Sequence, residues 1–369
     1  MKNIKIVHLT SVHPRHDARI FLKMCSSLAR KKLNVYLVVA DGAGNENKNN
    51  VKIIDVGSSK DRTQRVLQIS KLIYKKAKNL DADIYHLHDP ELLLIGVKLK
   101  KLGKKVIFDS HEDVALQILS KTYLNQRLRW IISKFYSIFE LWACRKIDAV
   151  IAATPTIANN FRQKEIKSID INNYPILDEL TLKKNEFDVK KNQFCYVGGL
   201  TQHRGIKEII EAIGRVDIST KLILAGNFGD EVFEDFCKGI KSWDQVNAVG
   251  FVDRNNIRTI LSESIAGINT LHPIPNYLDS LSVKMFEYMA AGIPIICSDF
   301  KLWRKIIEGN KCGICVDPMS PESISKAMLY IRDNPIEAKK MGQRGRNLVK
   351  KNFNWGKEEI KLLDLYNDL

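Results

Sequence analysis

The chain has 369 residues, of which 45% are hydrophobic, and its formal net charge at pH 7 is +16. This length favours two domains over one or three and is sufficient for substantial buried cores. The seven cysteines are scattered without the spacing of a disulfide framework, which excludes the disulfide-rich secreted class and fits a reducing cytosol.

Two features argue against export and against a membrane span. The N-terminus runs directly into an apolar strand pattern, without a basic leader and a cleavable apolar stretch. Even the apolar run 130–144 is interrupted by polar residues and is shorter than the roughly 18 residues that a span requires. We therefore expect a cytoplasmic protein without a transmembrane helix.

Cys312 and Cys315 form a Cys-x-x-Cys pair, which is compatible with zinc binding or redox chemistry. Zinc would need two further ligands, and neither a second pair nor a nearby histidine supplies them. A turn that enters a short strand is therefore the favoured interpretation.

Short β-rich apolar runs alternate with longer helical patterns along the chain. In the first half they predict strands over 4–10, 34–40, 83–89, 105–111 and 149–155. This alternation is interrupted by the polar stretch 178–192. It then resumes, with strands predicted over 193–199, 221–226, 266–271 and 293–299. This alternation indicates βαβ units and parallel sheets.

We therefore predict an α/β protein of two doubly wound domains, residues 1–178 and 179–352. The polar stretch 178–192 is the expected linker. A final helical pattern, 353–369, is expected to pack back on the first domain. In such sheets ligands bind beyond the carboxyl ends of the strands.

The excess positive charge raises the local concentration of anionic partners, whether nucleic acid, anionic lipid or phosphorylated substrate. Basic residues are dense in two predicted helices, 62–78 and 121–146, and the second interleaves them with aromatic residues. A helix that rests at a lipid interface and a core helix with a solvated basic face both fit this pattern.

Residues 282–292 form a predicted helix with Ser282 at its start, Gly292 at its end and Pro294 beyond. The free N–H groups and the dipole of its N-terminus favour an anion, and Ser280 and Ser282 add hydroxyl donors. The dipole disfavours a cation in the first turn, so Lys284 is more easily explained by a diphosphate than by helix stability. A solvent-exposed lysine is the alternative.

Glu287 lies one turn further along this helix, among mostly apolar residues, where a carboxylate needs donors. A ribose diol would supply two hydroxyl donors. The alternative is a local Lys284–Glu287 ion pair at i,i+3, in the less favourable order.

The run SLSVKMFEYMAAGIPII, 280–296, resembles the pattern of family-four glycosyltransferases of the GT-B fold. Glu287 matches the second glutamate of that pattern, which the resemblance assigns to the nucleotide ribose. Asp279 matches the first, where the family usually has glutamate in contact with the transferred sugar. The resemblance implies two Rossmann-like domains that face each other across a cleft.

A second segment, YVGGLTQHRGIKEIIEA, is similar to the family's glycine loop and helix at the start of the nucleotide-binding domain. It places Gly198 and Gly199 at the donor and Arg204 at the diphosphate, while Gly199 replaces a usual arginine. The loops AGNFGDE and VGFVDRNNI resemble those that border the base, with backbone contacts expected near Asn227 and Val252.

In the first half, the loop 10–21 resembles that of a subset of bacterial family-four enzymes, with Asp17 and Arg19 facing the acceptor. A helix N-cap for Asp17 and a surface charge for Arg19 are the alternatives. Two histidine clusters, HLHDPE and DSHED, also end predicted strands, but they lack an established metal-ligand spacing.

The resemblance instead assigns His111 and Glu112 to the position near the transferred sugar and the acceptor. His88 and Asp89 are also expected at the acceptor. A histidine side chain there is able to transfer a proton near neutral pH, whereas a satisfied core histidine is the alternative for His111.

The resemblance thus implies retaining, metal-independent transfer from a nucleotide diphosphate sugar to a hydroxyl, without a cofactor. The expected catalytic residues are His111, Arg204, Asp279 and Lys284. The implied acceptor is a polyprenyl-diphosphate-linked saccharide at the inner face of the cytoplasmic membrane, in O-antigen, capsule or exopolysaccharide synthesis. A nucleotide-sugar epimerase on the same fold is the main alternative. A nucleic-acid-binding protein is the other, although no such motif is present.

Overall fold

The computed structural model describes residues 4–119, 125–180 and 190–369. The chain divides into two compact units, Met1–Asn173 with Gly356–Leu369, and Tyr174–Trp355. Much of the predicted linker 178–192 lies outside the described residues, because 181–189 are not described. The two units are each α/β, which confirms the predicted fold class.

The first unit contains an eight-stranded sheet in the order β3-β4-β2-β1-β5-β6-β7-β8. Its strands are β1 (Lys5–Leu9), β2 (Asn34–Val39), β3 (Glu46–Lys48), β4 (Val51–Asp55), β5 (Ile84–Leu87), β6 (Lys105–Ser110), β7 (Ala149–Ala152) and β8 (Ser168–Asp170). β1 lies parallel to both neighbours, with Ile6 opposite Val35 and Ile84. All five predicted strands of this half are confirmed, at β1, β2, β5, β6 and β7.

β3 and β4 were not predicted, and they form the antiparallel edge of this sheet. Asn49 and Asn50 connect them with φ values of 52° and 59°. A two-residue hairpin of this type needs two left-handed residues, a conformation that asparagine tolerates. The Asn-Asn pair was therefore an overlooked signal for a hairpin.

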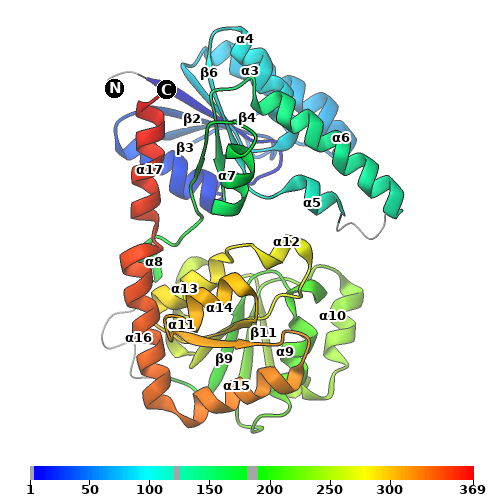
Figure 1. Cartoon of the computed structure of the whole chain (residues 1–369), viewed down its shortest axis with the longest axis vertical. Helices are drawn as coiled ribbons and strands as arrows, with labels where there is room; N and C mark the ends of the chain where they lie inside the picture. The colour runs from blue at the N-terminus through cyan, green and yellow to red at the C-terminus, as the bar shows by residue number, and fades with distance from the viewer. Residues whose placement is uncertain (1–3, 120–124, 181–189) are drawn as a thin grey trace. The chain divides into compact units, whose positions relative to one another are not determined.

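The helical segments of the first unit are η1 (Ala18–Cys25), α1 (Ser26–Arg30), α2 (Arg62–Gln64), η2 (Arg65–Ile69), α3 (Ser70–Leu80), η3 (Pro90–Leu92), α4 (Leu93–Lys101), α5 (Val114–Leu119), α6 (Gln126–Cys144), α7 (Pro155–Arg162) and α17 (Trp355–Asn367). The C-terminal helix α17 contacts the elements of this unit (Figure 1). Tyr366 lies 2.8 Å from Nδ1 of His86, and Glu358 accepts a 2.7 Å hydrogen bond from the backbone of Asn172.

α6 exposes most of its large apolar side chains, since its buried residues are Ser133, Ala143 and Cys144. Phe135 is 73% exposed and Trp130 is 58% exposed. The C-terminal part of α6 nevertheless packs on the core, where Ala143 and Cys144 are buried and Phe139 and Leu141 lie against them. Both alternatives for 121–146 therefore stay predictions, and residues 121–124 lie outside the described part. None of the helices in the described ranges has the length and apolarity needed to cross a membrane.

The second unit contains a parallel six-stranded sheet in the order β11-β10-β9-β12-β13-β14. Its strands are β9 (Gln193–Val197), β10 (Lys221–Ala225), β11 (Val246–Gly250), β12 (Ala266–Asn269), β13 (Ile295–Ser298) and β14 (Gly313–Val316). The four strands predicted for this half are confirmed. β14 also confirms the short strand predicted after Cys312, and all seven cysteines are free.

The helical segments of the second unit are α8 (Leu177–Leu180), η5 (Gln202–Arg204), α9 (Ile206–Ile213), α10 (Glu231–Lys238), η6 (Lys241–Gln245), α11 (Arg254–Glu263), α12 (Pro275–Leu278), α13 (Val283–Ala291), α14 (Lys301–Ile307), α15 (Pro321–Asp333) and α16 (Pro335–Asn352).

The core of the second unit fixes the orientation of α13, the helix predicted over 282–292. Met285, Phe286 and Tyr288 are fully buried in it. α16 approaches its end so closely that a Cβ at Gly342 would lie 2.0 Å from the carbonyl oxygen of Gly292. Gly292 ends α13 in the left-handed conformation, as predicted. With this face buried, Lys284 and Glu287 lie on the partly exposed side of the helix.

Candidate functional site

The loop after β9 brings two cations onto the backbone of one glycine. A Cβ at Gly198 would lie 3.0 Å from Nζ of Lys284 and 3.3 Å from Nη1 of Arg204. The φ of Gly198 is 133°, and a Cβ at Gly226 would meet the Gly198 carbonyl oxygen at 2.0 Å. This φ and the close approach of Gly226 favour glycine at position 198, which lets both cations lie directly against its backbone.

Lys284 reaches this point from the first turn of α13. Its ammonium donates a 3.0 Å hydrogen bond to the Tyr196 hydroxyl and lies 4.6 Å from the centre of that ring. Loss of hydration and the neighbouring Arg204 guanidinium lower the pKa of Lys284 to about 7. The protein thus holds two like charges together at a cost, as a site for an anion requires.

The charge of this pair is not neutralised within the described parts of the chain, where no ion pair includes Lys284 or Arg204. The nearby arginine of α11 differs, because Arg254 pairs with Glu179 and Glu287. We call Gly198, Arg204 and Lys284 the cation cluster.

Glu287 lies next to the cation cluster, and its side chain is 12% exposed. Nη1 of Arg254 donates a 2.8 Å hydrogen bond to its Oε1 atom. The alternative Lys284–Glu287 ion pair is therefore not formed. Arg254 was missed, although it follows Asp253, the side-chain N-cap of α11, in a loop already associated with the donor.

Ser282 stands at the N-cap position of α13, but among the described residues its side chain makes no capping hydrogen bond. Ser282 therefore begins α13 at the predicted position, but its hydroxyl does not cap the helix. The Ser280 hydroxyl instead donates a 2.9 Å hydrogen bond to the Tyr277 carbonyl oxygen. Donor contacts of both serines stay predictions.

The other predicted donor residues occupy loops at the same end of the sheet. Asp279 is exposed directly after α12. Asn227 follows β10, and its carbonyl oxygen accepts a 2.9 Å hydrogen bond from the N–H of Leu200. Val252 follows β11 and packs on the core of the unit. The Gly199 carbonyl oxygen accepts a 3.1 Å hydrogen bond from the Tyr196 hydroxyl. All these loops follow carboxyl ends of strands, where ligands bind in such sheets.

In the first unit, the buried carboxylate of Asp109 at the end of β6 contacts one arginine and two histidine side chains. Asp109 accepts hydrogen bonds from Nε and Nη2 of Arg19 at 2.9 and 2.7 Å. Its Oδ2 atom also lies 3.2 Å from Nδ1 of His88 and 2.9 Å from Nε2 of His111. Burial opposes ionisation, but Arg19 and His111 hold the pKa of Asp109 well below its usual range. We call Arg19, His88, Asp109 and His111 the Asp109 cluster.

Arg19 is 4% exposed, so the alternative that it is a surface charge is wrong. Its remaining nitrogen, Nη1, donates a 2.7 Å hydrogen bond to the Ile171 carbonyl oxygen. Asp17 caps η1 by accepting hydrogen bonds from the N–H groups of Arg19 and Ile20, as the helix N-cap alternative predicts. Burial opposes ionisation of Asp17, but the hydrogen bond with His13 helps to lower its pKa to about 2. Acceptor contacts of Asp17 and Arg19 stay predictions.

His88 and Asp89 are both buried. Asp89 accepts a 2.8 Å hydrogen bond from the Thr10 hydroxyl and a 2.6 Å hydrogen bond from the N–H of Ser11. Nε2 of His88 lies 2.8 Å from Nδ1 of His8, a residue that the sequence did not single out. His111 is the accessible member of the Asp109 cluster, with 21% of its side chain exposed.

Two sets of side chains have the proximity that a metal ion requires, His8 with His86 and His88, and His88 with Asp109 and His111. His8 and His88, however, lie at hydrogen-bond distance, and Asp109 already pairs with Arg19. These contacts favour hydrogen bonding over a metal ion. Independence from metal stays a prediction.

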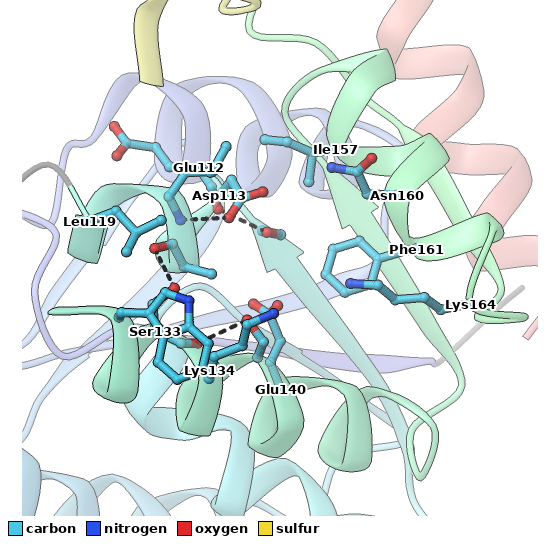
Figure 2. Close-up of a pocket in the computed structure, with 15 residues that line it drawn as sticks. Glu112, Asp113, Leu119, Ser133, Lys134, Glu140, Ile157, Asn160, Phe161 and Lys164 are labelled. Carbon is cyan, nitrogen blue, oxygen red and sulfur yellow. Dashed lines mark hydrogen bonds between the residues drawn. The ribbon is translucent and has the colours of Figure 1, made fainter. Parts of the chain in front are cut away.

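Glu112 follows His111 and accepts a 2.7 Å hydrogen bond from the side chain of Gln117. It lines a cavity of about 320 Å³ between α5, α6 and α7, within the first unit (Figure 2). This cavity was not predictable from sequence patterns, because its lining comes from separate segments of the chain.

Two family models match consecutive parts of the chain. The family described as Glycosyltransferase Family 4 matches residues 18–171, and that described as Glycosyl transferases group 1 matches residues 178–348. The chain belongs to the GT-B glycosyltransferases. The predicted family resemblance and enzyme class are thereby confirmed.

Individual relatives of this glycosyltransferase are distant. The D-rhamnosyltransferase WbpZ of Pseudomonas aeruginosa is 22% identical over 291 residues, which cover 75% of this chain and 71% of that protein. Sucrose-phosphate synthase from Thermosynechococcus elongatus has a TM-score of 0.80 at 16% identity, over 99% of this chain and 98% of that one. HepE of Anabaena, solved with UDP and glucose, has a TM-score of 0.77 at 13% identity, over 99% and 100%.

Proposed function

We propose that this glycosyltransferase takes a sugar from a nucleotide diphosphate sugar and that the cation cluster binds the diphosphate. The observation that carries the proposal is the convergence of Lys284 and Arg204 on Gly198, where neither forms an ion pair with a carboxylate of the described residues. A diphosphate would bring the missing negative charge and accept charge-assisted hydrogen bonds from both side chains. HepE, which shares the fold, was solved with UDP and glucose, and this supports the same class of donor.

The ribose is assigned to Glu287. Because Arg254 holds its Oε1 atom, the carboxylate is oriented before the donor binds. Ribose hydroxyls donate to such an acceptor-only group. The backbone near Asn227 and Val252 borders the base in this proposal, and Asp279 contacts the transferred sugar.

The departing diphosphate is stabilised by Arg204, Lys284 and the N-terminus of α13, so no metal ion or cofactor is needed for this step. Cations fixed where negative charge develops are among the largest contributions that a site makes to a rate. Retention of anomeric configuration follows from the family resemblance, with attack from the face that the leaving group departs from.

His111 is assigned to the acceptor hydroxyl. Its Nε2–H donates to the ionised Asp109, which fixes the tautomer and leaves Nδ1 as an acceptor for a proton. Asp109 therefore acts as a positioning residue, itself held by Arg19 and His88. His88, Asp89, Asp17, Arg19 and Glu112 surround or support the acceptor in this proposal.

The acceptor is a saccharide on a polyprenyl diphosphate, in O-antigen, capsule or exopolysaccharide synthesis at the inner face of the cytoplasmic membrane. Support comes from α6, which exposes large apolar side chains beside arginines and lysines, as peripheral membrane helices do. The exposed apolar residues of α6 are Leu128, Trp130, Ile131, Ile132, Phe135, Ile138 and Trp142.

The epimerase alternative is not favoured, because both family models are those of glycosyltransferases. The two activities are separated by incubating the donor without acceptor and analysing the nucleotide sugar. An epimerised donor would contradict transfer. Steep, salt-dependent binding of oligonucleotides would be needed to revive the nucleic-acid alternative.

The test of the donor site is a thermal-shift screen of UDP, GDP, CDP and their sugars. We expect at least one of them to stabilise the wild type, by about 2.7 kcal/mol at a hundredfold excess over Kd. Glu287→Ala and Lys284→Ala should lose most of this stabilisation, whereas Lys301→Ala, an exposed lysine at the start of α14, should keep it. If no nucleotide stabilises the wild type, the donor site is wrongly assigned.

A further inference from the structure

The cavity between α5, α6 and α7 lies beside the end of β6, where the Asp109 cluster is found. Ser110 and Glu112, the two neighbours of His111 in the sequence, both line it. In Figure 2, α6 contributes Lys134 and Glu140 on one side, and α7 contributes Asn160 and Phe161 on another. Its volume of about 320 Å³ lies at the small end of the range for ligand pockets, which suits a single sugar ring.

Glu140 is the most unusual group in this lining. Burial and, to a smaller extent, nearby Asp113 raise its pKa to about 7, although the Tyr136 hydroxyl donates a 2.9 Å hydrogen bond to its Oε1 atom. In the described parts of the chain this carboxylate has no ion pair. It therefore needs further donors, and uncharged hydroxyl groups supply them without a second buried charge.

The charge of the lining argues against an anionic ligand. Three carboxylates, from Glu112, Asp113 and Glu140, face two ammonium groups, from Lys134 and Lys164. A phosphate or diphosphate would meet more negative than positive charge. An alkyl chain fits no better, because it would exclude water from these charged groups and offer them no hydrogen bond in return.

Two aromatic rings contribute to the apolar part of the lining, together with aliphatic side chains from Ala115, Leu116, Leu119 and Ile157. Trp130 and Phe161 come from different helices, and Trp130 is 58% exposed, with the Lys134 ammonium 5.8 Å from its ring centre. A sugar ring carries hydroxyls at its edge and C–H groups on its faces. The combination of a carboxylate, an amide and aromatic rings matches both parts.

We propose that this cavity binds one neutral monosaccharide unit of the acceptor, with Glu140 accepting from its hydroxyls and Trp130 packing on its ring. The proposal rests on the proposed function, because it makes the cavity the part of the acceptor site that recognises the sugar. It places that unit beside the end of β6 and separates sugar recognition from lipid contact along α6. Trp130 contacts the saccharide, whereas Phe135, which does not line the cavity, faces outward.

The test uses the full chain and saturation-transfer NMR with a panel of methyl glycosides of neutral hexoses, 6-deoxyhexoses and N-acetylhexosamines. We expect at least one glycoside to receive saturation on its ring protons from the wild type. Glu140→Gln and Trp130→Ala should each weaken this binding by tenfold or more. Phe135→Ala on the same helix is the matched control and should leave it unchanged.

A glycoside that binds the wild type and both cavity variants equally would overturn the proposal, as would a panel in which none binds. Binding of n-octanol that is lost in Trp130→Ala would instead assign the cavity to an alkyl chain. Stabilisation by nucleoside diphosphates is measured on the same samples and should be unchanged in Glu140→Gln. A wild type that binds a nucleoside diphosphate but none of the glycosides thus refutes the cavity proposal alone, whereas absence of nucleotide stabilisation refutes the donor site.

Discussion

The cation cluster and the Asp109 cluster both centre on an arginine, but they treat its charge in opposite ways. Arg19 is buried and fully engaged by Asp109 and a backbone carbonyl oxygen. Arg204 lies beside a second cation, Lys284, and in the described residues neither has a carboxylate partner. The first arrangement is complete without a ligand, whereas the second holds positive charge that a bound anion would neutralise.

This difference separates residues that shape a site from residues that bind in it. Removing one member of a buried, hydrogen-bonded ion pair leaves the other charge buried without a partner. This lowers the free energy of unfolding. Removing one of two like charges relieves their repulsion, so it lowers mainly the affinity for the ligand and not the stability of the fold. The two clusters should therefore respond oppositely to substitution.

The largest effect is expected for Arg19→Ala, which leaves Asp109 buried without its cation. We expect the free energy of unfolding to fall by about 3–5 kcal/mol, measured by urea denaturation. Arg30→Ala is the control, because its pair with Glu359 lies at the surface and is worth about 1 kcal/mol or less. A loss below about 1 kcal/mol for Arg19→Ala would show that the Asp109 cluster is not a structural pair.

Lys284→Ala should behave in the opposite way. Loss of a charge-assisted hydrogen bond of about 1.5–3 kcal/mol raises the Kd of a nucleoside diphosphate by about ten- to a hundredfold. The free energy of unfolding should change by less than about 1 kcal/mol, because a desolvated charge is removed as well. Calorimetric titration and urea denaturation give the two values. If Lys284→Ala lowers the free energy of unfolding but leaves the Kd of the nucleoside diphosphate unchanged, Lys284 is a structural residue and not a ligand-binding one.

Much of the difference between the two clusters could not be predicted from sequence patterns. Most strands and α13 were predictable because their periodicity and their flanking glycines are local. The Arg19–Asp109 pair joins residues 90 positions apart, and Glu287 meets Arg254 across 33 positions. Periodicity carries no information on such pairs, so Arg19 was assigned to the acceptor or to the surface, and its buried pairing was missed.

The pH dependence of donor binding tests whether the charge of Lys284 contributes to affinity. The pKa of Lys284 is about 7 in the free protein, and a bound diphosphate raises it. The contribution of its charge to affinity is therefore complete below about pH 7 and is lost as the pH rises through the pKa of the complex. We expect Kd to rise by up to about tenfold per pH unit between pH 7 and 9. Lys284→Arg, which stays charged, should flatten this profile.

A profile that is equally steep in Lys284→Arg would assign the titration to another group. Proton uptake gives an independent check, since binding heats measured in buffers of different ionisation enthalpy should differ for the wild type alone.

A smaller effect is expected at the ribose. If Glu287 accepts from the ribose diol, UDP or the preferred nucleotide should bind about fivefold more tightly than its 2′-deoxy form, for a net gain of about 1 kcal/mol. Glu287→Ala should bind both forms with similar affinity. Discrimination that persists in this variant would place the ribose elsewhere.

The most direct test of the central claim is a crystal structure of the full chain with the nucleoside diphosphate that stabilises it most. The proposed donor site requires a phosphate oxygen within about 2.7–3.2 Å of both Nζ of Lys284 and a guanidinium nitrogen of Arg204, beside Gly198. A diphosphate bound at the Asp109 cluster, or one that leaves Lys284 and Arg204 without contact, would contradict it.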